Sequence, residues 1–413
     1  MRLLFLTYYF EPDLCAGSFR NTSLFHEIRK RLGKGDFIHV FTTKPNRYNT
    51  FKVSSQAKEH GINYVIDRIL IPEHKSGMLD QAKSFTVFYH EVMKRIKYED
   101  FDLIYASSSR LFTAFLGKRI ASLKKCPLYL DIRDIFVDTM KDVFKDREII
   151  QIPVFAFSKI IEKYTFSNAT HINLVSEGFK DYFSKYKNPS YTYFTNGIDD
   201  VFLNAETYKD KRIQFPRIIT YAGNIGNGQG LEKVIPFAAQ KLSKNYLFRL
   251  IGDGSTKRIL QQKIEELHIT NVEILDPVPR KELFEYYNQS TFLFLHLNEL
   301  NAFKKVLPSK LFEYGAFNKP IIAGVGGYAA QFIKDNLSNY ILFEPTDVDD
   351  LVNQIKDYRL SFEERVSFKQ KYSRKAINQR MADDILNICA AKLLQKSEMR
   401  KDIVIELSYK GFG

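Results

Sequence analysis

Short apolar runs alternate with longer mixed segments along the whole chain of 413 residues. Short apolar runs bounded by polar loops are typical of strands buried in a parallel sheet, and the mixed segments between them suit helices. The pattern therefore predicts repeated strand and helix units, and so an α/β fold. The runs that we interpret as strands, some with a following loop glycine, cover residues 2–7, 37–42, 64–70, 102–107, 171–176, 217–226, 246–254, 271–278 and 291–297.

The alternation occurs twice, which predicts two Rossmann-like domains facing each other across a cleft. We expect an N-terminal domain over residues 1–203, a C-terminal domain over 204–385, and a helix and tail over 386–413. The polar run 204–212 is interpreted as the linker, and helices within 361–395 are expected to cross back to the first domain. With 45% apolar residues, the chain can form two cores of ordinary size.

The most informative stretch is 306–323, interpreted as a loop, a short helix and a buried strand. Pro308 and Ser309 mark the helix start, where free backbone N–H groups attract phosphate. Lys310 adds a positive charge in the first turn, and Glu313 would reach a ribose attached to that phosphate. The alternative is an ordinary capped helix with a solvated Lys and Glu.

Two loops of the first half carry further candidates. Gly17, Ser18 and Arg20 follow the first strand at the start of a predicted helix, where a glycine lets the backbone approach an anion. The run 127–134 is a buried strand ending in Asp131, Arg133 and Asp134, at the sheet edge where α/β folds bind ligands. The alternative for the first loop is an unremarkable loop glycine, and for the second a structural ion pair, Asp131–Arg133 or Arg133–Asp134.

The segment Leu307-Pro308-Ser309-Lys310, with Glu313 and Tyr314 following, resembles the donor-binding segment of retaining GT-B glycosyltransferases of family 4, in particular bacterial O-antigen and capsule enzymes. The resemblance implies that Glu313 is the second acid of that family's Glu-(seven residues)-Glu motif. The first acid falls at Lys305, a departure that leaves the donor sugar contacts, and so the sugar, undefined.

The same resemblance implies further roles. Gly17 and its neighbours would close over the donor phosphates, and Asp131, Arg133 and Asp134 would face the acceptor. Asn224 and Gln229 stand where many members have an arginine and a lysine, so Lys310 would carry more of the charge neutralisation, helped by Lys304 or Lys305. The other donor-binding positions are Gly223, Asn224, Gly226, Gly252, Val278, Asn301, Phe303 and Lys304.

The resemblance implies transfer of a sugar, such as an N-acetylated or deoxy aminosugar, from a UDP-sugar to a polyprenyl-diphosphate-linked glycan, with retention. No cofactor besides the donor is expected, and no metal, because no Asp-x-Asp pair stands where one would bind. A UDP-aminosugar epimerase on the same scaffold and a basic-surface binding protein are the alternatives. A dehydrogenase is disfavoured because no Gly-x-Gly-x-x-Gly follows the first strand.

Charge and hydropathy bear on location. Lys and Arg number 61 against 48 Asp and Glu, and the excess is spread over both halves, which favours an anionic membrane surface and anionic substrates over nucleic acid. The apolar segment 149–166 suits shallow insertion into a bilayer, or else a core helix. Without a predicted span or signal peptide, and with three isolated cysteines, we expect a cytoplasmic protein peripheral to the inner face of the cell membrane.

Overall fold

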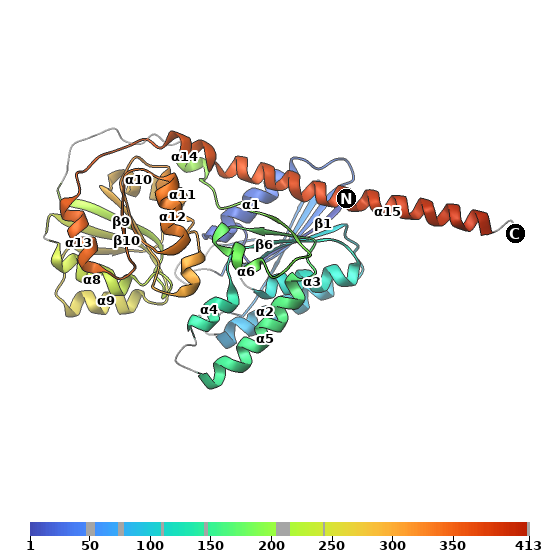
Figure 1. The fold of residues 1–413 in the computed structure, drawn as a ribbon, viewed down its shortest axis with the longest axis horizontal. Helices are drawn as coiled ribbons and strands as arrows, with labels where there is room; N and C mark the ends of the chain where they lie inside the picture. The colour runs from blue at the N-terminus through green and yellow to red at the C-terminus, as the bar shows by residue number, and fades with distance from the viewer. Residues whose placement is uncertain are drawn as a thin grey trace.

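The structure is a computed structural model that describes residues 1–46, 54–72, 78–108, 111–143, 148–203, 215–242 and 244–410. It has two α/β domains side by side, with the C-terminal domain on the left in Figure 1 and the N-terminal domain on the right. This confirms the predicted pair of Rossmann-like domains. The predicted linker 204–212 lies outside the described residues.

The N-terminal domain is built on an eight-stranded sheet in the order β3-β4-β2-β1-β5-β6-β7-β8. Its strands are parallel except β3, which pairs antiparallel with β4. The central strands are almost wholly buried, as their continuous apolar runs predict. The strands are β1 (Arg2–Thr7), β2 (Phe37–Thr43), β3 (Lys58–Gly61), β4 (Tyr64–Ile69), β5 (Leu103–Ser108), β6 (Leu128–Ile132), β7 (His171–Leu174) and β8 (Ser190–Thr192).

Helices cover both faces of this sheet, and an apolar cluster lies under each covering layer. The helix predicted to follow the first strand corresponds to α1. The helices are α1 (Ala16–Arg29), α2 (Met78–Arg95), α3 (Leu111–Lys124), α4 (Phe136–Val143), α5 (Glu148–Phe166), the 3-10 turn η1 (Glu177–Phe179), α6 (Lys180–Phe183) and α7 (Asp200–Leu203).

The C-terminal domain has a six-stranded parallel sheet in the order β11-β10-β9-β12-β13-β14. Its strands are β9 (Arg217–Asn224), β10 (Tyr246–Asp253), β11 (Val272–Leu275), β12 (Phe292–His296), β13 (Ile321–Gly324) and β14 (Tyr340–Phe343). Its helices are α8 (Leu231–Lys241), α9 (Lys257–Glu266), α10 (Arg280–Gln289), η2 (Asn301–Lys305), α11 (Lys310–Gly315), α12 (Gly327–Asn336), α13 (Val348–Asp357) and α14 (Val366–Lys371).

The chain passes between the domains near Gly197 and returns at α15 (Arg374–Lys410). The two crossings touch through their backbones: Ile198 N–H donates to the Tyr372 carbonyl at 2.8 Å, and Arg374 N–H donates to the Ile198 carbonyl at 2.9 Å. A Cβ at Gly197 would lie 2.5 Å from Arg374 Cα, so only glycine permits this approach.

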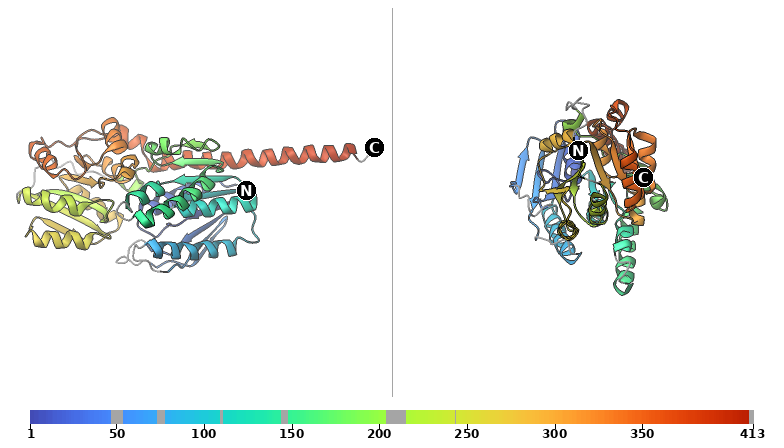
Figure 2. Two further views of the ribbon diagram at one scale, coloured as in Figure 1. Left: turned by 60° about the horizontal axis from the view of Figure 1, so that its bottom comes forward. Right: turned by 90° about the vertical axis from the view of Figure 1, so that its left-hand side faces the viewer.

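The helix α15 runs across the N-terminal domain and extends beyond it, as Figures 1 and 2 show. Met381, Ala382, Ile385 and Cys389 pack into the apolar cluster beside α1. The predicted return of the C-terminal helices is therefore confirmed. One helix, α15, continues from Arg374 to Lys410 through the predicted boundary at residue 386, so the C-terminal helix expected there is the continuation of the helix that crosses back.

Candidate functional site

Two cavities lie side by side between the domains. The first, of about 300 Å³, is lined from the N-terminal domain by residues 14–16 and Phe19, and from the C-terminal domain by the ends of β9, β10 and α11. The second, of about 240 Å³, adds Arg133 and Asp134. Both cavities are lined by Ala16, Gln229, Ser309 and Lys310, so these residues form the junction.

Lys310 lies at this junction, at the start of α11, where the sequence predicted a helix beginning at Ser309. Its side chain extends over Gly223: a Cβ built on that glycine would meet the Lys310 ammonium group and its Cε atom. Gly223 has φ of +145°, a conformation that side chains rarely adopt. Lys310 Nζ also lies 5.3 Å from the centre of the Tyr221 ring. A half-buried glycine and an aromatic ring thus position the cation.

Asn224 and Gln229 occupy the loop where the family has cations, and they bind each other through a 2.7 Å hydrogen bond. His296 contacts the same loop, with its Nδ1 2.6 Å from the Gln229 carbonyl. Its Nε2 accepts from the Thr346 N–H at 3.1 Å, so Nδ1 carries the ring proton. Burial lowers the pKa of His296 to about 4. This wall is therefore polar and neutral, and Lys310 is the one cation at the junction of the two cavities among the lining residues described.

The far wall of the first cavity is apolar. Ile251, Pro277, Val278 and Leu283 line it beside Gly252. Gly252 has φ of +156°, and a Cβ there would overlap the backbone of Gly223. The wall can pack against the flat face of a nucleobase, which fits the donor-binding role expected of Val278.

Glu313 closes the first cavity one turn after Lys310. Its Oε1 accepts a hydrogen bond from Arg280 Nη2 at 3.1 Å. Arg280 also pairs with Asp199, and Asp199 pairs with Arg374. The predicted ribose acid is thus held by an arginine, in an alternating network of charges that reaches the domain crossings.

Arg133 and Asp134 line the second cavity from the N-terminal domain. A Cβ at Gly17 would meet the Arg133 guanidinium, which places this cation against the first turn of α1. Burial lowers the pKa of Arg133, and its Nε has no hydrogen-bond partner among the described residues. A desolvated cation of this kind favours an anionic or hydroxyl-rich ligand.

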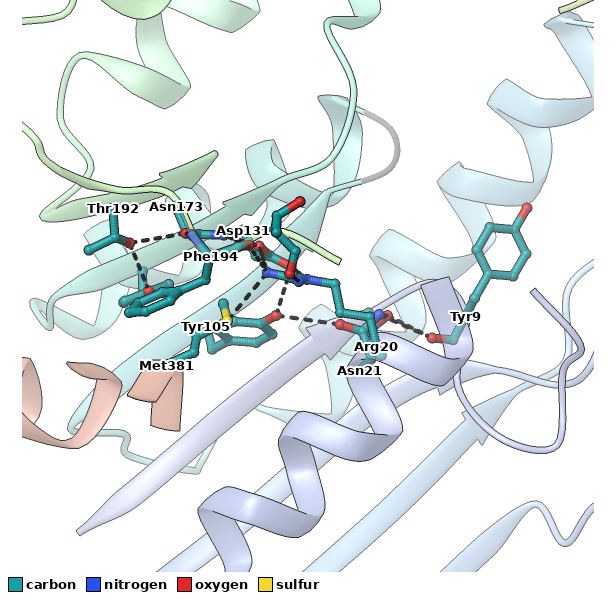
Figure 3. A network of polar contacts seen from close by, with 12 residues as sticks. Tyr9, Arg20, Asn21, Tyr105, Asp131, Asn173, Thr192, Phe194 and Met381 are labelled. Atoms are coloured by element: carbon teal, nitrogen blue, oxygen red, sulfur yellow. Dashed lines mark hydrogen bonds and ion pairs between the residues drawn. The ribbon is translucent and has the colours of Figure 1, made fainter. Parts of the chain in front are cut away.

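The structure contradicts the expected placement of Asp131 and Arg20. Arg20 Nε and Nη2 donate to the two carboxylate oxygens of Asp131 at 2.8 and 2.9 Å, and both side chains are buried. Asn173 and Tyr105 also donate to Asp131, and Arg20 binds the Phe194 carbonyl, as Figure 3 shows. Burial alone would raise the pKa of Asp131, but the Arg20 guanidinium outweighs it and lowers the pKa. Asp131 is thus held in a structural ion pair, but with Arg20 and not with Arg133, and neither Arg20 nor Asp131 lines the two cavities.

Other predicted residues also lie apart from the two cavities. Asn301 and Lys304 are exposed on η2, and Ser18 is buried, beside a third cavity of about 790 Å³. Lys305, at the position of the family's first acid, pairs with Asp138 of α4 at 2.6 Å. Lys304 and Lys305 therefore do not assist Lys310, whereas Phe303 and Pro308 line the second cavity as predicted.

Sequence reasoning missed two contributors, Arg280 and His296, and did not single out Phe19 within the predicted glycine loop at 17–20. Arg280 and His296 each contact residues far away in the chain, so no local motif marks them. Arg280 begins a helix directly after Pro279, a position that suggests only a helix start. The described residues hold no group of three or more His, Cys, Asp or Glu side chains placed to bind a metal.

The surface of α5 carries apolar side chains that nothing covers within the described chain. Ile152, Phe157 and Ile160 are 70%, 60% and 68% exposed. Lys159 and Lys163 are exposed beside them. The helix projects from the N-terminal domain at the bottom of Figure 1. Among the helices described, none is both long and apolar enough to cross a membrane.

Residues 205–375 match the family described as glycosyl transferases group 1. A 173-residue stretch is 26% identical to WcaI of Escherichia coli (strain K12), named as a colanic acid biosynthesis glycosyl transferase; the match spans 39% of this chain and 42% of WcaI. Anabaena Alr3699/HepE, solved with UDP and glucose, superposes with a TM-score of 0.63 at 15% identity over 94% of this chain and all of that one.

WaaG, a glycosyltransferase involved in lipopolysaccharide biosynthesis, superposes with a TM-score of 0.62 at 14% identity, over 94% of this chain and 98% of WaaG. These superpositions cover nearly the whole of both chains, and they show that the two proteins share the fold of this chain. The group 1 match covers the C-terminal domain, which contributes Lys310 and Glu313 to the cavities.

Proposed function

We propose, from the premise that this chain has the GT-B fold and carries a glycosyl transferases group 1 domain, that it transfers a sugar from a UDP-sugar to a lipid-diphosphate-linked glycan. One observation carries the proposal: Lys310 stands where the two cavities between the domains meet. A cation at that point suits a diphosphate that joins a nucleoside in one cavity to a sugar in the other.

The first cavity suits the nucleoside. Its apolar wall with Val278 and Pro277 would stack the base, and Glu313 would accept hydrogen bonds from the ribose hydroxyls. The relative Alr3699/HepE was solved with UDP and glucose, which favours uridine as the nucleoside.

The second cavity suits the transferred sugar and the acceptor hydroxyl. Lys310 and the N–H groups at the start of α1 would stabilise charge that develops on the leaving diphosphate. In the front-face route, that diphosphate accepts the proton of the acceptor hydroxyl, the glycosidic bond to the donor breaks, and the new bond forms on the same face. This route gives retention, and Arg133 and Asp134 would orient the acceptor.

An epimerase would surround the sugar with carboxylates. Asp134 is the single acid among the described residues that line the second cavity, and Lys305 is turned to Asp138. We therefore favour sugar transfer over epimerisation. We also propose that the transferred sugar is an aminosugar.

Peripheral binding to the inner face of the cell membrane completes the proposal. The exposed apolar side chains of α5 lie beside Lys159 and Lys163, the combination that anionic lipid surfaces attract. A protein bound to the membrane through this surface would reach a lipid-linked acceptor there.

The test is a thermal-shift panel of nucleotides and nucleotide sugars with uridine, guanosine and adenosine bases. A ligand at a hundred times its Kd stabilises the native state by about 2.7 kcal/mol. We expect uridine compounds to raise Tm most. A panel in which no uridine compound raises Tm would reject the assignment of the donor.

A further inference from the structure

We propose that Arg280 is a positioning residue that couples occupancy of the nucleotide cavity to the relative orientation of the two domains. The inference rests on the proposed function, because it takes Glu313 as the acid that binds the ribose. Arg280 is the first residue of α10 and lines both the first cavity and the neighbouring cavity of about 790 Å³.

The first contact fixes Glu313. Arg280 Nη2 donates to Glu313 Oε1 at 3.1 Å, while the hydroxyl of Tyr287 lies 3.5 Å from Oε2. A carboxylate accepts about four hydrogen bonds. Arg280 therefore orients the carboxylate and leaves acceptor positions for two ribose hydroxyls.

The second contact reaches both crossings between the domains. Arg280 pairs with Asp199, which follows the first crossing, and Asp199 pairs with Arg374, which begins the return helix α15. Arg374 also donates to the Gly197 carbonyl at 2.9 Å. Glu313, Arg280, Asp199 and Arg374 thus form a chain of alternating charge from the nucleotide cavity to the hinge.

The third contact reaches the N-terminal domain. The guanidinium carbon of Arg280 lies 4.0 Å from the centre of the Phe19 ring, within cation–π distance. Phe19 belongs to α1 and lines the same two cavities as Arg280. The side chain that holds the ribose acid therefore also rests on the opposite domain.

Some hydrogen-bond donors of the Arg280 side chain have no partner among the described residues. These donors are the Nε and Nη1 atoms, and both are buried. Leaving a buried donor unpaired is costly, so a side chain that served only the ion pairs would be poorly satisfied here. A bound ligand, or a shift of one domain relative to the other, can supply hydrogen-bond acceptors for these donors. Arg280 can therefore link ligand binding to the orientation of the domains.

The experiment compares the wild type with Arg280→Gln, Arg280→Lys and Phe19→Leu, using UDP as the probe. Lys281→Gln, an exposed neighbour on α10, is the control for loss of one charge. Calorimetry measures UDP affinity, and hydrogen exchange with and without saturating UDP measures protection of residues 196–203 and 372–376. Melting curves identify variants that do not fold.

We expect UDP to protect both crossing segments in the wild type and in Lys281→Gln. Arg280→Gln should bind UDP about tenfold or more weakly and lose the protection even at saturation. Arg280→Lys keeps the charge but lacks the planar guanidinium group, so it too should lose the protection. Phe19→Leu should also lose the protection, with a smaller loss of UDP affinity. If Arg280→Gln does not fold, Phe19→Leu and Arg280→Lys decide the question.

Equal protection in the wild type and the folded Arg280 variants would overturn the inference, as would a wild type that binds UDP without protecting the crossings. Either result leaves the proposed function standing. A wild type that binds no UDP would overturn both.

Discussion

The ammonium group of Lys310 occupies the space in which a side chain at Gly223 would begin. The glycine at the end of β9 and the lysine at the start of α11 are thus complementary, and the cation reaches the junction of the two cavities because position 223 has no Cβ. This relationship makes Lys310 the residue on which the proposed chemistry depends most.

Lys310→Ala should lower turnover by about two to three orders of magnitude, the usual effect of removing one group that stabilises charge in the transition state. The assay would follow UDP release from the donor identified by thermal shift. Lys304→Ala, a neighbouring exposed lysine outside both cavities, is the matched control and should turn over normally. Near-normal turnover of Lys310→Ala would remove Lys310 from the mechanism.

Glu313→Gln should weaken UDP binding by about tenfold, because a charged acceptor for the ribose hydroxyls becomes a neutral one. The contact is checked by calorimetry with UDP and 2′-deoxy-UDP on both proteins. We expect the wild type to prefer UDP and the variant to distinguish the two ligands much less. An unchanged preference would place the ribose elsewhere.

The exposed face of α5 should bind anionic vesicles. Replacing Phe157 and Ile160 together by serine removes two side chains worth roughly 1.5–3 kcal/mol each when buried, so cosedimentation should fall by at least about tenfold. Ile259→Ser, on a helix of the C-terminal domain and also exposed, should bind as the wild type does. Phe155 is unsuited to the test because it packs on the core. Undiminished cosedimentation of the double variant would exclude insertion by α5.

The Arg20–Asp131 pair should contribute to stability. Asp131→Asn leaves the buried Arg20 charge without its counterion, so we expect a loss of about 3–5 kcal/mol in the free energy of unfolding by urea. Asp181→Asn, at an exposed position, should change it by less than about 0.5 kcal/mol. Similar values for the two variants would show that the pair is not needed for the fold.

His296 should make the protein sensitive to mild acid. Its pKa is about 4 in the folded state and about 6.5 when unfolded, so between these values the unfolded chain binds more protons. The free energy of unfolding should therefore fall as pH drops from about 6.5 to about 4, by up to about 1.4 kcal/mol per unit. His296→Asn, whose amide can replace Nδ1–H, should show a shallower loss over that range. An equal slope would assign the acid sensitivity to other groups.

The sequence predicted the sheets well because buried parallel strands are continuous apolar runs, such as Leu3 to Leu6 in β1. It missed β3, a mostly polar strand at the sheet edge with no apolar pattern. The run 403–405 consists of β-branched residues, which local preference favours in strands, yet it lies within α15. Extending an existing helix costs far less than starting one, so local preference is overridden there.

The residues of the candidate site likewise divide into those that the sequence predicted and those that it did not. Lys310 and Glu313 were predicted from local sequence and Val278 from the family resemblance, and all three line the first cavity. Asp131 was expected in the cleft because it ends a strand, but α1 brings Arg20 against it. Arg280 was missed because Phe19, Asp199 and Glu313 meet it from three distant parts of the chain. A single sequence does not show which charged residues, far apart in the chain, will form ion pairs.

The packing of α15 has a consequence for how the protein is made. Met381, Ile385 and Cys389, near the end of the chain, fill the apolar cluster beside α1, and Tyr129 donates to Asp384 at 3.0 Å. A ribosome delivers the N-terminal domain first, yet that domain lacks part of its interior until these residues emerge. The half of the protein that is synthesised first is therefore the half whose folding is completed last.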